Sequence, residues 1–326
     1  MAAALELWSD ATLAGLEDLA DEARAFIAET KAPATLRAYR SDWAHFEAWT
    51  RARGLPALPA APETVALYLT DMARTYKAAT IQRRISSISQ AHQAAGLDSP
   101  TGERIVRMAH AGIRRAIGTA QHGKTPVLTA DIRRMVDTLD DSLLGRRNRA
   151  LLLIGFAGAF RRSELVGLDV GDVQETSDGL VVVLRRSKTD QEGAGRKLGI
   201  PYGSTPATCP VRALRAWLEA AAIDDGPLFR PGDPITSRRP VRVGNVRLSD
   251  KSVARIVKIA AEAAGLDPAN YAGHSLRSGL ATSAAAAGAS ERSIMNQTGH
   301  KSLPMVRRYI RDGSLFRDNA AAAVGL

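Results

Sequence analysis

Cysteine is almost absent from this 326-residue chain, in which Cys209 is the only one. A single cysteine cannot form an internal disulfide, so we expect a reducing compartment, the cytoplasm, as the natural setting. Long apolar runs are also lacking, because the longest, residues 150–160, is too short to cross a bilayer. The opening residues, MAAALELWSD, have no basic flank before an apolar stretch. We therefore expect neither a signal peptide nor a membrane partner.

The chain also lacks the sequence motifs that hold a nucleotide or a catalytic metal. It contains no Walker-type glycine loop, no HExxH and no acidic triad suited to Mg²⁺. These absences are consistent with chemistry that uses protein side chains alone, without a cofactor or a metal.

Acidic residues are too few to balance the basic ones, and the net charge is +10. Residues 1–30 hold seven acidic residues and one basic, whereas residues 31–119 hold thirteen basic and six acidic. The remainder holds thirty basic and twenty-one acidic, so the excess positive charge is spread over most of the chain. Two interpretations stay open: a generally basic surface, or a groove that binds a polyanion such as DNA.

The first 119 residues predict an acidic segment, 1–30, followed by a small helical bundle over residues 31–118. Apolar spacing predicts helices from Thr35 to about Gly54, from Pro62, over about 80–95 and over about 103–117. The acidic segment has no clear role: it is either a partly disordered leader or an extra helix that contacts a neighbouring subunit.

The polar face of the third and fourth predicted helices is basic and amide-rich. No acidic residue occurs from Met72 to Leu97. Arginine, glutamine and serine hydrogen-bond base edges and phosphates, and a helix fits the major groove. A solvated surface is the alternative, although acidic residues would then normally be interspersed. The candidate DNA-contacting residues are Lys77, Gln82, Arg83, Arg84, Ser86, Gln90, Arg104, Arg107 and Arg114.

Residues 119–126 are expected to be a linker to a second, mainly helical domain over residues 127–326. The β-branched run at 180–184 predicts a strand, and residues 196–200 could return beside it as a hairpin. Helices are predicted over about 129–139, 148–160, 210–222, 249–264, 276–287, 291–297, 303–311 and 314–324. The expected fold is mainly α, with one small antiparallel sheet.

Several polar residues of this second domain form ordinary patterns when each is taken alone. Arg161 and Glu164, in GAFRRSEL, match a surface i,i+3 pair. His274 and Arg277 project from one helix face, and such pairs are usually structural. A lone helical tyrosine such as Tyr309 is normally a core residue.

Taken in order, these segments resemble the tyrosine recombinase family, which includes the phage integrases and Cre-like enzymes. The order is R-x-S-E-L, a lysine in the strand loop, H-x-L-R, G-H and Y, and the resemblance covers about residues 31–326. It implies a helical core-binding domain, a linker and a catalytic domain with one small sheet. The wording from His274 to His300 is close to that of the family's second box.

The resemblance implies a role for each residue of the set. Arg161 and Arg277 would grip the non-bridging oxygens of the phosphate that is cut. Tyr309 would be the nucleophile, and His274 would take its proton or stabilise its charge. Lys188 would protonate the departing 5′-oxygen, His300 would hydrogen-bond the phosphate and Glu164 would orient its neighbours.

The implied reaction forms a 3′-phosphotyrosyl link and exchanges strands through a Holliday junction. The implied partner is double-stranded DNA with specific recombination sites. The implied assembly is a homotetramer on paired sites, with a monomer or weak dimer when free. The segment 314–324 would be a helix that docks on the neighbouring subunit. The alternatives are a type IB topoisomerase-like enzyme and a catalytically silent DNA-binding protein.

Overall fold

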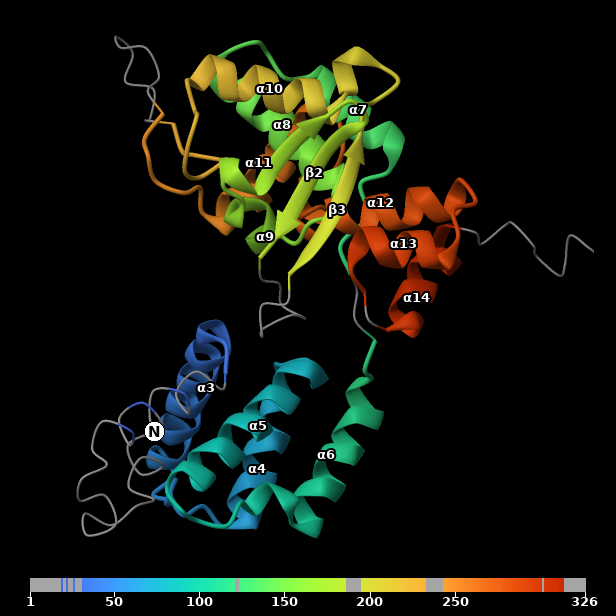
Figure 1. The fold of residues 1–326 in the computed structure, drawn as a ribbon. Helices are drawn as coiled ribbons and strands as arrows, with labels where there is room; N and C mark the ends of the chain where they lie inside the picture. Colours follow the sequence, from blue (N-terminus) through green and yellow to red (C-terminus); the bar gives the residue numbers. More distant parts are fainter. Residues whose placement is uncertain are drawn as a thin grey trace, which may run out of the picture. The chain divides into compact units, whose positions relative to one another are not determined.

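The computed structural model describes residues 19, 22, 26, 31–120, 123–185, 195–232, 243–300 and 302–313, with backbone alone for 310–313. The chain divides into an N-terminal unit, Met1–His122, and a C-terminal unit, Gly123–Leu326 (Figure 1). This boundary falls inside the stretch where the sequence predicts a linker. No described helix is both long and apolar enough to cross a membrane.

The described part of the N-terminal unit consists of helices packed around one apolar core (Figure 1). Phe46, Leu69 and Ile81 are fully buried there, as the apolar spacing predicts. Thr35 does not cap the first helix, because Pro33 takes the first helical position after Ala32. The elements are α3 (Pro33–Arg51), α4 (Pro62–Met72), α5 (Ala78–Ala94), η2 (Pro100–Gly102) and α6 (Arg104–Ile117).

The C-terminal unit is mainly helical with one small sheet, as predicted. Its helix α8 begins at Leu143, earlier than the predicted 148, because the Ser142 hydroxyl accepts the Gly145 N–H at 3.1 Å. Likewise Thr129 does not cap α7, since Leu128 is the cap residue. The helices are α7 (Thr129–Asp137), α8 (Leu143–Ala157), α9 (Arg162–Gly167), α10 (Pro210–Ala221), α11 (Asp250–Ala263), α12 (His274–Ala286), α13 (Glu291–Thr298) and α14 (Leu303–Gly313), with 3-10 turns η3 (Val170–Asp172), η4 (Pro206–Thr208) and η5 (Pro268–Asn270).

The sheet is antiparallel in the order β1 (Val173–Thr176), β2 (Gly179–Leu184) and β3 (Arg196–Pro201). The predicted hairpin is present, with Leu180 opposite Ile200 and Leu184 opposite Arg196. Strand β1 was not expected. Its sequence, VQET, has one apolar residue and forms an edge with two exposed positions, so it carries little apolar signal.

Two apolar clusters meet along α12 and thereby position the functional residues. The large core includes α8 and α10, which pack together, and its Trp217 donates to the Leu228 carbonyl at 2.9 Å. The small cluster joins α12, α13 and α14 through Ala281, Ile294 and Val306 (Figure 1). Helix α12 packs on both α8 and α14. It therefore fixes the end of α8 relative to α14.

Candidate active site

Arg161, which is partly buried, and Glu164, which is buried, form an ion pair at the start of α9. Arg161 is the residue before the helix, and Glu164 stands at its third position. The Glu164 carboxylate accepts the Arg161 backbone N–H at 2.8 Å and its Nη1 at 2.5 Å. The Glu164 side chain is only 2% exposed, so the surface pair expected for an isolated RxxE is instead an enclosed ion pair. It holds the Arg161 guanidinium in one orientation.

Ala159 turns the chain sharply between α8 and Arg161. Its φ of +48° is unusual for a residue with a side chain and costs about 1–2 kcal/mol. In this conformation its carbonyl accepts Arg277 Nη1 at 2.7 Å. Backbone strain of this kind persists where the surrounding structure enforces it, often at functional sites.

Arg277, on α12, is the most enclosed cation of the group, with 1% of its surface exposed. Burial, followed by the charge of Arg161, lowers its pKa to about 10, so it stays charged at neutral pH. Its Nη1 lies 4.0 Å from the Glu164 carboxylate. Its buried Nε has no hydrogen-bond partner among the described residues. A donor is therefore left for an acceptor that the described residues do not supply.

His300 lies in the turn between α13 and α14 and is 7% exposed. Its Nε2 is 3.3 Å from Arg277 Nη2, and its Nδ1 is 2.8 Å from the Thr298 hydroxyl. An arginine can only donate, so Nε2 accepts and the proton is on Nδ1. Burial, then the charges of Arg277 and Arg161, lowers the His300 pKa to about 4. His300 is therefore neutral at pH 7.

His274, on α12, and Tyr309, on α14, lie close together in the same site as the arginines. His274 Nε2 lies 3.2 Å from the Tyr309 hydroxyl oxygen. The Tyr309 ring is half-buried against the small apolar cluster, and it lies 5.7 Å from the His300 ring. The structure thus brings together Arg161, Glu164, His274, Arg277, His300 and Tyr309.

Comparisons with known proteins agree with this arrangement. The model described as "Phage integrase family" matches residues 127–314, which is more than half of the chain. The chain belongs to this family of tyrosine recombinases. The model described as "Phage integrase, N-terminal SAM-like domain" matches residues 24–96 of the recombinase.

Individual relatives are similar over most of the recombinase. It is 44% identical to the integrase/recombinase xerD homolog of Selenomonas ruminantium, covering 96% of this chain and 92% of that protein. It is 30% identical to tyrosine recombinase XerC of Corynebacterium efficiens, covering 86% and 81%. The crystal structure of a lambda integrase dimer bound to a COC′ core site has the same fold, with a TM-score of 0.58 at 21% identity, covering 91% of this chain and 77% of that one. Neither the topoisomerase nor the silent DNA-binding alternative is favoured.

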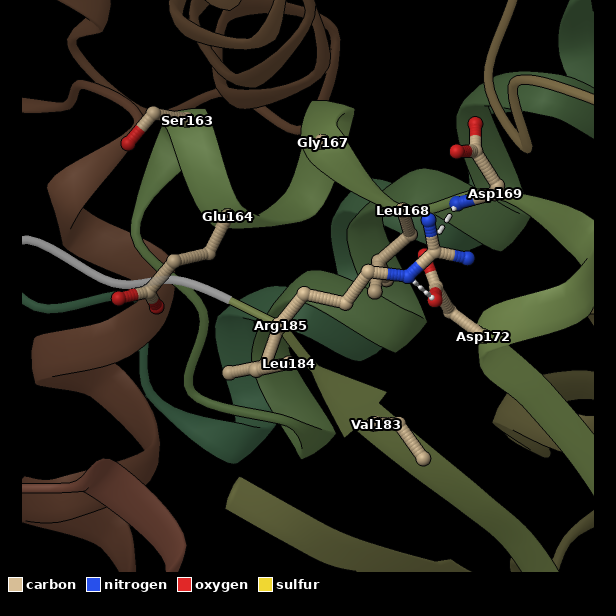
Figure 2. Close-up of a pocket in the computed structure, with 9 residues that line it drawn as sticks. All are labelled: Ser163, Glu164, Gly167, Leu168, Asp169, Asp172, Val183, Leu184 and Arg185. Atoms are coloured by element: carbon tan, nitrogen blue, oxygen red, sulfur yellow. Dashed lines mark hydrogen bonds and ion pairs between the residues drawn. The ribbon is translucent and has the colours of Figure 1, made fainter. Parts of the chain in front are cut away.

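Three predicted features of the recombinase lie outside the described residues. These are Lys188, the helix expected over residues 314–324, and the acidic segment 1–30, of which only residues 19, 22 and 26 are described. Arg185 is the last described residue before Lys188, and its Nε contacts Asp172 at 2.6 Å. Arg185 lines a cavity of about 490 Å³. Figure 2 shows its side chain extending toward Asp172, away from Glu164. Arg185 therefore does not join the cationic cluster.

The candidate DNA-facing residues of the N-terminal unit divide into two groups. Arg84 is buried, with its guanidinium 4.0 Å from the Tyr76 ring centre and 3.8 Å from Asp42. Its side chain packs inside the bundle, so it is not part of an exposed face. Arg83 pairs with Asp42 at 2.6 Å but is half exposed. The exposed remainder is Lys77, Gln82, Arg104, Arg107 and Arg114, with Ser86 and Gln90 half-buried.

Arg196 is a member of the cluster that sequence reasoning missed. It was expected only as the first residue of a returning strand. Its charge helps to lower the pKa of both Arg277 and His300. The one available signal was a basic residue at the strand start, directly after the loop that carries Lys188.

Proposed function

We propose that this recombinase cuts and rejoins double-stranded DNA at specific recombination sites with Tyr309 as its nucleophile. The observation that carries the proposal is the 3.2 Å approach of His274 Nε2 to the Tyr309 oxygen, in the same site as the buried Arg277 and the partly buried Arg161. A tyrosine that is placed on a proton acceptor, next to positive charge, is suited to attack a phosphate.

The proposed first step breaks one bond and forms another. The Tyr309 oxygen attacks the phosphorus, its proton passes to His274 and the bond from phosphorus to the 5′-oxygen breaks. Lys188 supplies a proton to that oxygen. The result is a 3′-phosphotyrosyl link and a free 5′-hydroxyl, and attack by another strand's 5′-hydroxyl reverses the step. No nucleotide or metal is needed for this exchange.

Arg161 and Arg277 stabilise the charge that builds on the phosphate oxygens. Glu164 orients both of them. His300 first accepts a hydrogen bond from Arg277. When a phosphate takes that Arg277 donor, His300 loses its Nδ1 proton to solvent and gains one from solvent on Nε2, while the Thr298 hydroxyl, which now donates to the Ile294 carbonyl at 2.7 Å, turns to donate to Nδ1. His300 Nε2–H then donates to the phosphate.

The remaining parts of the chain follow from the same proposal. Residues 31–118 act as a core-binding domain that contacts DNA through the exposed residues of α5 and α6. Residues 119–126 act as the linker, and residues 127–326 as the catalytic domain. A tetramer assembles on paired sites in the cytoplasm, held in part by the C-terminal segment, and a Holliday junction forms between two rounds of exchange.

The test compares wild type with Tyr309→Phe on a library of randomised duplexes that carry single nicks. A nick close to the cut lets the short 5′-hydroxyl fragment leave, so the covalent adduct accumulates. We expect a detergent-stable adduct with wild type and none with Tyr309→Phe, while both shift the duplexes in a gel. Tyr271→Phe serves as the matched control and should form the adduct. An adduct on Tyr309→Phe would contradict the nucleophile assignment.

A further inference from the structure

Arg196 connects strand β3 to the end of helix α13. Its Nη1 donates to the carbonyls of Asn296 and Gln297, at 3.0 and 3.2 Å. These carbonyls belong to the last turn of α13, which has no further turn to satisfy them. One nitrogen of Arg196 therefore caps the helix that leads into the His300 turn.

The rest of the guanidinium packs directly beneath that turn. A Cβ atom placed on Gly299 would lie 2.9 Å from Arg196 Cζ and Nε, and 3.2 Å from Nη2. Only a glycine leaves enough room, and its φ of +66° also favours glycine. Arg196 thus lies against the residue that precedes His300 in the chain.

The second terminal nitrogen of Arg196 has no partner in the part of the chain that the structure describes. Nη2 is buried and makes no hydrogen bond to any described residue. Arg277 Nε, in the same cluster, is unpaired in the same way. A buried charged donor without an acceptor costs more than about 1–3 kcal/mol, and native proteins keep few such groups. Two unpaired donors in one site, Arg196 Nη2 and Arg277 Nε, indicate that a bound anion accepts a hydrogen bond from each.

Arg196 lies within electrostatic range of Arg161 and Glu164. Burial is the largest influence on its pKa and lowers it, while Glu164 raises it and Arg161 lowers it. Arg161, Arg196 and Arg277 carry three positive charges against the single carboxylate of Glu164. A phosphodiester under attack by a phenolate carries two negative charges at the reaction centre, so an additional guanidinium there is favourable.

We infer that Arg196 is a third arginine of the reaction site, whose Nη2 donates to a non-bridging oxygen of the phosphate being cut. The inference rests on the proposed function and deepens it. Because Nη1 of the same side chain caps α13, phosphate binding and the position of His300 are joined through one residue. A helix-capping role alone would leave Nη2 without a purpose.

The test uses Arg196→Lys, which keeps one donor nitrogen for the α13 carbonyls and loses the second. The matched control is Arg215→Lys, because Arg215 is an exposed arginine of α10 that pairs with Glu175. Arg196→Gln is measured in parallel and also keeps a single donor group. Protection of the buried Cys209 thiol shows that each variant is folded. The substrate is the duplex recovered from the wild-type adduct, with a nick beside the cut.

On this duplex we expect Arg196→Lys to cleave about 100-fold more slowly in a single turnover, with DNA affinity nearly unchanged. Arg215→Lys should match wild type. A second duplex carries a methylphosphonate at the cut and is prepared as each of its two diastereomers, because each lacks a different non-bridging oxygen. In the diastereomer that lacks the partner of Nη2 the penalty of Arg196→Lys should shrink to about tenfold or less.

The other possible results contradict either the inference about Arg196 or the proposed function. Equal penalties on the first duplex and on both diastereomers would show that Arg196 acts only by holding α13, and a variant as fast as wild type would remove it from the reaction. If wild type itself forms no adduct, the proposed function fails together with the inference. If wild type forms the adduct and Arg196→Lys is unaffected, only the inference fails.

Discussion

The buried, neutral His300 makes the C-terminal unit sensitive to acid. Burial, then the charge of Arg277, lowers the His300 pKa to about 4, whereas a histidine in an unfolded chain titrates near 6.5. Below pH 6.5 the unfolded chain therefore binds a proton that the folded chain does not. The free energy of unfolding therefore decreases as the pH falls from 6.5 toward 4. The two pKa values give a decrease of about 2 kcal/mol by pH 5.

The assay compares wild type with His300→Asn, which does not titrate and keeps a polar group near Thr298. Cys209 is the only cysteine and is fully buried in the C-terminal unit, so its labelling reports unfolding of that unit alone. Each protein is equilibrated in urea and pulsed with a disulfide reagent that reacts in acid. Carboxylates and the other histidines titrate in both proteins. Their contributions therefore cancel in the difference between the two free energies of unfolding.

At pH 7.5 we expect wild type to be the more stable, because His300 holds Arg277 and Thr298. Between pH 7.5 and 5 this advantage should shrink by about 2 kcal/mol, since only wild type loses the histidine contribution. An advantage of the same size at both pH values would refute the account of His300 as a neutral buried support.

Two further predictions concern the backbone around the site. Ala159→Gly should raise the stability of the C-terminal unit by about 0.5–1 kcal/mol in the same assay, because glycine adopts φ near +48° without strain. Ala222→Gly, at φ +50°, should gain a similar amount. A loss of stability in Ala159→Gly alone would contradict the strain at Ala159. Gly279→Ala should destabilise by about 1–3 kcal/mol, because its Cβ would lie 1.9 Å from the Val127 carbonyl oxygen, whereas Gly167→Ala, which has open space, should be close to neutral.

Local sequence patterns predicted the elements whose signal lies in their own residues. The spacing of Ile81, Ile85 and Ile88 predicted α5, and the β-branched run predicted β2. The start of α8 was placed too late because its first turns are basic, and Arg147 is nevertheless buried there. A charged residue in a helix indicates a solvent-exposed face only where no residue from another element of the fold encloses it.

Contacts between distant segments could not be predicted from local patterns. Arg84 was assigned to an exposed face by its type, but Asp42 on α3 and the ring of Tyr76 enclose it. Arg196 became a site residue only because the chain returns much later at Gly299 and leaves no side chain in the way. The order of polar residues indicated the catalytic set because a family resemblance, rather than periodicity, connected them.

The most direct test of the central claim is to identify the amino acid that carries the DNA. The wild-type adduct is formed on nicked duplex, digested with nuclease and protease, and the modified peptide is sequenced by mass spectrometry. We expect one peptide, with a 3′-nucleotide phosphate on the Tyr309 oxygen, the atom 3.2 Å from His274 Nε2. A nucleotide on Tyr202, Tyr271 or any residue other than Tyr309 would contradict the account.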